Sequence, residues 1–70
     1  MAETALDRGK AELKLNRFHA ARQEFINAIK ERPGDQKAYL FLGRTLEILK
    51  EWDDAKATYL HGVLFDKPIF

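Results

Sequence analysis

The chain of 70 residues contains no cysteine and has a formal net charge of +1, with 12 Lys and Arg against 11 Asp and Glu. The absence of cysteine excludes a disulfide framework and a thiolate metal site, and the balanced charge provides no field that would attract nucleic acid or anionic lipid. No apolar run approaches the roughly 18 residues that span a bilayer, and the amino-terminal stretch MAETALDRGK lacks the apolar core of a signal peptide. We therefore expect a cytoplasmic protein with neither a membrane nor a nucleic acid as partner.

Apolar residues at helical spacing, separated by turn signals, predict four helices in chain order. They lie near residues 3–15, 19–31, 36–49 and 53–66, with short turns near 16–18 and 50–52. Pro33 and Gly34 interrupt the middle of the chain, and Asp35 can cap the helix that follows. Asp53 and Asp54 fall in the first turn of the last helix, where carboxylates favour the macrodipole. The predicted fold class is all-α.

The sequence also repeats itself at an offset of 34 residues. The matched residues agree in identity, size or charge: Leu6 with Leu40, Gly9 with Gly43, Lys10 with Arg44, Leu15 with Leu49, Phe18 with Trp52, Ala21 with Ala55, Phe25 with Tyr59 and Ala28 with Gly62. The chain divides into two units, residues 2–35 and 36–69, with no room for a linker. We expect one domain over residues 1–70.

Gly43 lies inside a predicted helix, where glycine costs about 1 kcal/mol relative to alanine. Its presence predicts that a second helix packs too closely there for a side chain.

These residues together resemble the tetratricopeptide repeat, a helix-turn-helix unit of 34 residues. The first copy reads Gly9, Phe18, Ala21, Phe25, Ala28 and Pro33, and the second reads Tyr39, Leu42, Gly43, Trp52, Ala55, Tyr59 and Gly62, with Pro68 one residue late. The resemblance implies four antiparallel helices in a short right-handed superhelical array. It also implies that the small residues let paired helices approach closely while the aromatic residues fill the space beside them.

The first repeat departs from this pattern at two positions. Arg8 and Glu12 stand where the second repeat has Leu42 and Leu46, although the family prefers apolar residues there. Such positions face the preceding repeat in a stack, so we expect the array to begin at this amino terminus.

The carboxyl-terminal end departs in the opposite direction, because Lys30 and Glu31 of the first repeat correspond to apolar residues of the second. Contiguous apolar surface marks an interface, and a solenoid normally ends in a polar cap. We expect a two-fold dimer, with a return of the tail onto Leu64 as the alternative. The predicted self-association patch consists of Leu64, Phe65, Ile69 and Phe70.

Signals of catalysis or of a cofactor are absent from the sequence. His19 and His61 belong to different repeats, and neither has an acidic residue at the spacing of a helical metal motif. Asp53 and Asp54 are better explained as the start of a helix than as a catalytic carboxylate pair. We expect no enzyme activity, no cofactor and no metal site.

The resemblance places a binding groove on the first helix of each repeat. The residues that map to it are Glu3, Leu6, Lys10, Leu13, Lys14, Lys37, Leu40, Arg44, Glu47 and Ile48. This basic and aliphatic mixture suits a partner peptide or helix with acidic and apolar side chains. We expect Lys10 and Arg44 to make no core contact. Family members that clamp chaperone carboxyl termini use lysine and asparagine where this chain has Leu6, Lys10 and Phe41, so we do not predict that ligand.

Three functions are weighed from the sequence. The leading prediction is a non-enzymatic protein interaction module that can also self-associate. The alternative is a purely structural unit for homo-oligomerisation, or a piece of a longer repeat array. A helix-turn-helix nucleic-acid binder is disfavoured because Glu47 and Glu51 interrupt its best candidate recognition helix.

Overall fold

A computed structural model describes residues 3–65 of the chain, with side chains for residues 3–62. Within these residues the chain forms four helices: α1 (Ala5–Lys14), α2 (Phe18–Glu31), α3 (Gln36–Ile48) and α4 (Trp52–Phe65). The predicted boundaries agree with them to within two residues at every end. The all-α prediction is therefore confirmed.

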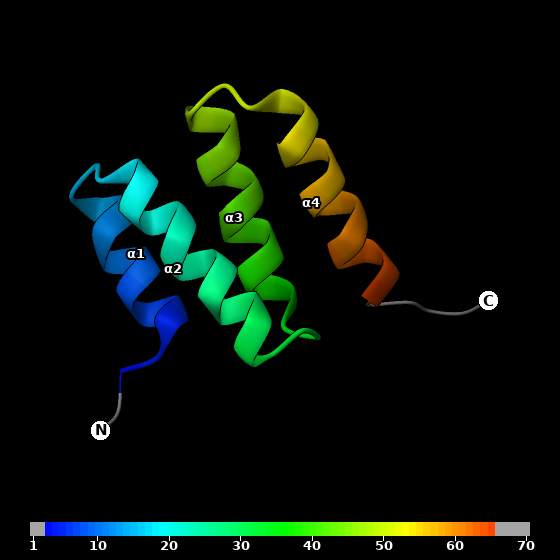
Figure 1. Cartoon of the computed structure of the whole chain (residues 1–70), viewed down its shortest axis with the longest axis horizontal. Helices are drawn as coiled ribbons and strands as arrows, with labels where there is room; N and C mark the ends of the chain where they lie inside the picture. Colours follow the sequence, from blue (N-terminus) through cyan, green and yellow to red (C-terminus); the bar gives the residue numbers. More distant parts are fainter. Residues whose placement is uncertain (1–2, 66–70) are drawn as a thin grey trace.

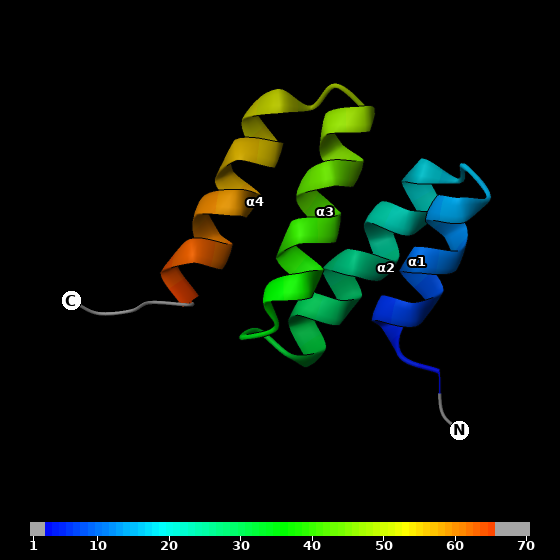
Figure 2. The ribbon, with the colours of Figure 1, turned by 180° about the vertical axis from the view of Figure 1, so that it is seen from behind.

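The helices lie side by side in chain order, and each runs antiparallel to the one before it (Figures 1 and 2). Each helix packs on its predecessor, and α1 also touches α3. The pairs α1 with α2 and α3 with α4 correspond to the two sequence repeats, so α1 and α4 form the two edges of the described part.

Polar side chains mark the starts of α1 and α3. The N–H of Asp7 donates to Thr4 Oγ1 at 3.1 Å, and the N–H of Thr4 donates to Asp7 Oδ2 at 3.4 Å, which forms a capping box. The N–H of Lys37 donates to Asp35 Oδ1 at 3.0 Å. The predicted cap at Asp35 is confirmed, and it begins the second repeat directly after the Pro33 turn.

The two short turns inside the repeats share one backbone conformation. Asn16 has a φ of 60° and its counterpart Lys50 has a φ of 62°, so both residues adopt the left-handed region. After Lys50, the N–H of Glu51 donates to Leu46 O at 2.8 Å, and the first turn makes the equivalent bond. These are the hydrogen bonds of a Schellman-type helix end, where glycine or asparagine is preferred. Lys50 is the less suitable residue of the two.

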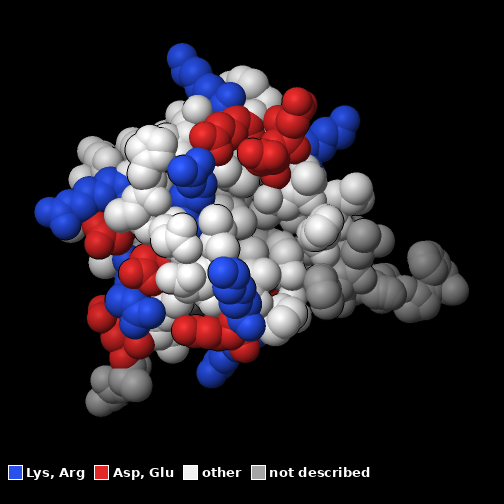
Figure 3. All heavy atoms as spheres, in the orientation of Figure 1, with Lys and Arg blue, Asp and Glu red and all other residues white. Residues whose placement is uncertain are grey.

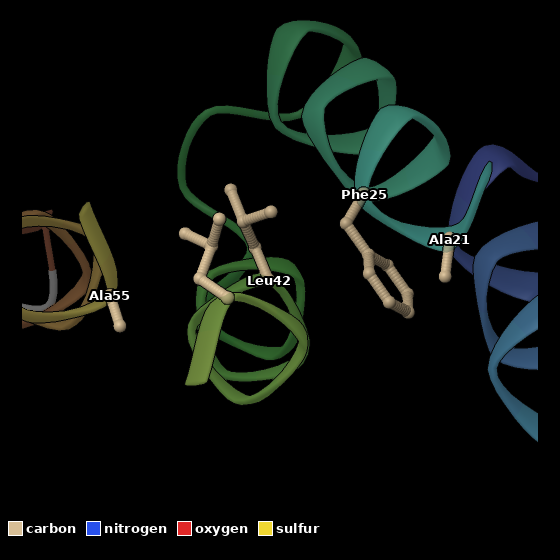
Figure 4. Packing of buried hydrophobic residues seen from close by; sticks show 5 residues of the cluster. Ala21, Phe25, Leu42 and Ala55 are labelled. Atoms are coloured by element: carbon tan, nitrogen blue, oxygen red, sulfur yellow. The ribbon is translucent and has the colours of Figure 1, made fainter. Parts of the chain in front are cut away.

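The main core lies between the repeats. Phe25 and Ala21 of α2 are fully buried against Leu42 and Leu46 of α3, with Ala55 of α4 completing the cluster. Figure 4 shows the Phe25 and Leu42 side chains projecting into the space between α2 and α3. Burying one such large side chain stabilises the fold by about 1.5–3 kcal/mol. The expectation that the two leucines face the preceding repeat is confirmed.

The charged counterparts of those leucines form ion pairs within the first repeat. Arg8 Nε donates to Glu24 Oε1 at 3.2 Å, and Glu12 Oε1 lies 3.5 Å from Arg17 Nη1. In the first repeat, Arg8 and Glu12 thus form ion pairs at the positions where Leu42 and Leu46 build the core in the second repeat.

Close packing over glycine occurs at the same place in both repeats. A Cβ atom on Gly9 would lie 2.5 Å from Phe25 Cε1, and a Cβ atom on Gly43 would lie 2.5 Å from Tyr59 Cζ. Real Cβ atoms do not approach other atoms so closely, so a side chain at either position requires the aromatic ring to move. The prediction that a helix packs against Gly43 is confirmed.

A second pair of contacting positions holds residues of different size in the two repeats. Ala5 and Ala28 pack together in the first repeat, where both are buried. In the second repeat these positions hold Tyr39 and Gly62, and a Cβ atom on Gly62 would lie 2.9 Å from Tyr39 Cβ. The larger residue on α3 is therefore accommodated by the smaller residue on α4.

One expectation about packing is wrong. Trp52 was expected to pack beside the small residues, but it is 58% exposed, whereas its counterpart Phe18 is half-buried. Leu60 is 57% exposed, while its counterpart Ile26 packs against the core. The core against which Ile26 packs includes Leu42 and Leu46 of α3, and the described residues contain no helix in the equivalent place beside Leu60 of α4.

Gly43→Leu should destabilise the fold, because its side chain would displace the Tyr59 ring. Overpacking of this kind costs about 1–3 kcal/mol, which lowers Tm by about 5–20 °C in a domain of this size. Thermal unfolding followed by circular dichroism measures the change. Gly34→Leu is the matched control, because Gly34 is exposed and a Cβ atom there would meet nothing within 4 Å. An unchanged Tm for Gly43→Leu would contradict the close-packing argument.

Lys50→Gly should stabilise the fold, because glycine adopts the left-handed conformation without steric cost. The expected gain is about 1 kcal/mol, or about 4–8 °C in Tm. Lys50→Ala removes the same charge but keeps a Cβ atom, so it should leave Tm nearly unchanged. Equal effects of the two substitutions would show that charge, and not backbone conformation, is responsible.

Candidate partner-binding groove

The predicted groove residues lie on α1 and α3 or, for Glu3, just before α1. Two of them, Leu6 and Leu13, are half-buried and pack against the core. The other eight are exposed: Glu3, Lys10, Lys14, Lys37, Leu40, Arg44, Glu47 and Ile48. Leu40 and Ile48 are the exposed apolar members, at 43% and 48%. The surface therefore offers aliphatic side chains among charged ones.

Lys10 joins α1 to α3 through an aromatic ring. Its Nζ lies 5.6 Å from the centroid of the Phe41 ring, in cation–π geometry. Phe41 in turn stacks on the buried Phe25, with ring centroids 5.5 Å apart and an interplanar angle of 17°. The expectation that Lys10 makes no core contact is wrong, because a ring attached to the core extends beneath its ammonium group.

Sequence reasoning missed Phe41 as a groove residue. Helical spacing could have found it, because Lys37, Phe41, Arg44 and Ile48 follow one another at intervals of three or four residues on one face of α3. Its half-buried ring packs against the core and lies beneath Lys10 of the predicted groove.

Glu47 is engaged by the neighbouring helix. The Tyr59 hydroxyl donates to Glu47 Oε1 at 3.0 Å. Burial raises the pKa of Tyr59, and the hydrogen bond and negative charge of Glu47 raise this pKa further, while Arg44 acts in the opposite direction. One oxygen of this groove carboxylate is thereby occupied from within the protein.

The cations of the predicted groove are not neutralised by acidic neighbours, unlike the three arginines that form ion pairs in the described residues. Arg8, Arg17 and Arg22 each form an ion pair with a glutamate. Within residues 3–62, no ion pair joins the four groove cations, Lys10, Lys14, Lys37 and Arg44, to an acidic side chain. They therefore leave positive charge available to an incoming ligand.

The two histidines lie apart from this surface, on α2 and α4. His19 Nδ1 lies 3.4 Å from Arg22 Nη2. Among the side chains that the structure describes, no three from His, Cys, Asp and Glu are placed to hold a metal ion. None of the helices in the described segment has the length and apolar character needed to cross a membrane.

The sequence profile described as "Tetratricopeptide repeat" matches residues 6–61. The chain belongs to the tetratricopeptide repeat family. Repeats of this family generally mediate protein–protein interactions and are typically not enzymes. No curated protein and no solved structure matched the chain.

Membership of the tetratricopeptide repeat family confirms the resemblance drawn from the sequence, and the two repeats account for the four described helices. It makes α1 and α3 the first helices of their repeats. The binding role of individual residues on those helices stays a prediction.

Proposed function

We propose that this tetratricopeptide repeat chain is a non-enzymatic, cytoplasmic interaction module, one domain over residues 1–70, that binds an acidic and apolar segment of a partner protein. The proposal rests on one observation: four cations without an internal ion pair lie around exposed aliphatic side chains on α1 and α3. A ligand carboxylate there would meet charge that no described acidic side chain neutralises.

The two kinds of side chain have separate roles in this proposal. Exposed charges at the edge of an interface steer association and select against the wrong partner, whereas apolar anchors hold the bound segment. Leu40 and Ile48 are the candidate anchors on α3 because both are exposed at the groove. Lys10 contributes positive charge and also covers the Phe41 ring. Replacing Lys10 therefore changes the charge of the groove and uncovers this ring.

The variant Lys10→Glu/Arg44→Glu should weaken binding of an extended peptide in which glutamate and leucine alternate. We expect at least a tenfold loss of affinity by calorimetry, because two attractive charges become repulsive. Loss of the Lys10 cation–π contact costs about 0.5–1 kcal/mol, so circular dichroism should still show a folded chain.

Arg32→Glu/Lys56→Glu is the matched control for the same charge change, since both residues are exposed and neither is on α1 or α3. It should retain most of the affinity. Equal losses in the two double variants would attribute binding to net charge alone and would refute the groove.

Self-association is a second candidate function, and the exposed side of α4 favours it. Trp52 and Leu60 are more than half exposed on that helix. Of the predicted patch, the side chains of Leu64 and Phe65 lie outside the described residues, as do Ile69 and Phe70 entirely. We infer that a second copy covers the carboxyl-terminal end of α4 through a two-fold contact. A dimer of this kind also fits the alternative of a purely structural unit for homo-oligomerisation.

Analytical ultracentrifugation tests the dimer. The wild-type chain should dimerise, and Leu64→Lys/Phe65→Glu should be monomeric because it places charges in the apolar contact. The exchange Lys30→Glu/Glu31→Lys changes the counterpart positions of α2 and should leave the dimer intact. A wild-type chain that stays monomeric at high micromolar concentration would exclude this function.

A further inference from the structure

A second groove lies between α2 and α4. These two helices do not pack on each other within the described residues, because α3 lies between them. Two adjoining cavities of about 350 Å³ and 410 Å³ occupy the gap, and both are lined by Ile26, Leu42, Ala57 and Thr58. Together they form one continuous depression along α3.

The lining of this groove is mainly apolar. Ile26 and Ile29 form the wall on α2, and Leu42 and Leu46 contribute to the floor on α3. The wall on α4 includes Ala57, whose short side chain is exposed. Leucine or isoleucine side chains of a ligand would fit such a surface.

The length of the floor indicates how the ligand is built. Tyr39 and Leu46 line opposite ends of the groove and are seven residues apart on α3, which is about 10 Å along a helix axis. A second helix presents apolar side chains over the same distance when they occur at positions i, i+4 and i+7.

The two ends of the groove carry opposite charge. Asp54 lines one end, where Glu51 is already held by Arg22 through hydrogen bonds of 2.8 and 2.9 Å. Lys30 lines the other end, beside His61. Figure 3 shows acidic side chains gathered near the α3–α4 turn and uncharged surface extending from there over the middle of the molecule. Asp54 and Lys30 form no ion pair within the described residues.

We propose that this groove binds an amphipathic helix of a partner protein, with the helix amino terminus at Asp54 and its carboxyl terminus at Lys30. Its positive dipole end then meets the acidic end of the groove, and its negative dipole end meets the basic end. The bound helix runs antiparallel to α3 and inserts the side chains at i, i+4 and i+7. This site shares no residue with the groove on α1 and α3.

A second copy of the chain fits this groove poorly. Among the described helices, α4 exposes Trp52 and Leu60. Suppose that α4 of a second copy entered the groove with its amino terminus at the acidic end. Its own Asp53 and Asp54 would then lie against Asp54 of the groove. The like charges oppose this arrangement, so a helix from another protein is the better occupant.

The probe is a designed helical peptide of about 15 residues with leucine at i, i+4 and i+7, blocked at both ends and carrying a nitroxide at its amino terminus. Titration into the isotopically labelled chain should shift the amide resonances of Ile26, Ile29, Leu42 and Ala57. The nitroxide should broaden resonances near Asp54 and leave those near Lys30 sharp.

Ala57→Arg should weaken this binding at least tenfold, because the long side chain fills the groove from an exposed position. Ala20→Arg makes the same change at an exposed site of α2 that does not line the groove, and it should bind like the wild type. Asp54→Lys/Lys30→Glu should reverse the end that the nitroxide broadens.

Several results would overturn the proposal. They are no resonance shifts at millimolar peptide, shifts confined to α1 and the Lys37 side of α3, equal affinity of the two arginine variants, and broadening near Lys30 in the wild type. Shifts of the groove resonances that follow protein concentration without peptide would assign the groove to a second copy instead. The Lys10→Glu/Arg44→Glu variant should bind this peptide normally. Loss of binding at the groove between α2 and α4 can therefore be distinguished from loss of binding at the groove on α1 and α3.

Discussion

Phe25 is the side chain on which three of the described helices depend. It extends from α2, lies over Gly9 of α1, and packs against Leu42 and Phe41 of α3. The fully buried ring can take this position because glycine leaves the surface of α1 open. The same contact that closes the first repeat therefore also joins it to the second, and it reaches the groove through the Phe41 ring beneath Lys10.

The second repeat repeats this arrangement with different partners. Tyr59 takes the place of Phe25 over Gly43, but its hydroxyl group reaches Glu47, so the ring is anchored by a hydrogen bond at the surface. The Tyr39 and Gly62 pair replaces two alanines without opening the contact between helices. In each of these contacts in the second repeat, a large residue on one helix lies against a glycine on the other, so the two helices stay closely packed.

The alternation of helices creates two surfaces of different chemistry. In the predicted groove on α1 and α3 the exposed residues are four cations, two aliphatic side chains and the carboxylates of Glu3 and Glu47. Between α2 and α4 the lining is mainly apolar, and Asp54 and Lys30 lie at its opposite ends. The second surface exists because α3 holds its neighbours apart.

The sequence by itself determined the four helices, the offset of 34 residues and the close approach at Gly43, because helical spacing, turn residues and glycine act locally or repeat at a fixed interval. It also supplied the residues proposed for the groove. Only the tertiary structure decided that Phe41 lies under Lys10, that Trp52 is exposed, and that a mainly apolar groove lies between α2 and α4. These features depend on which helices contact each other across the two repeats. The spacing of side chains within one helix carries no information about those contacts.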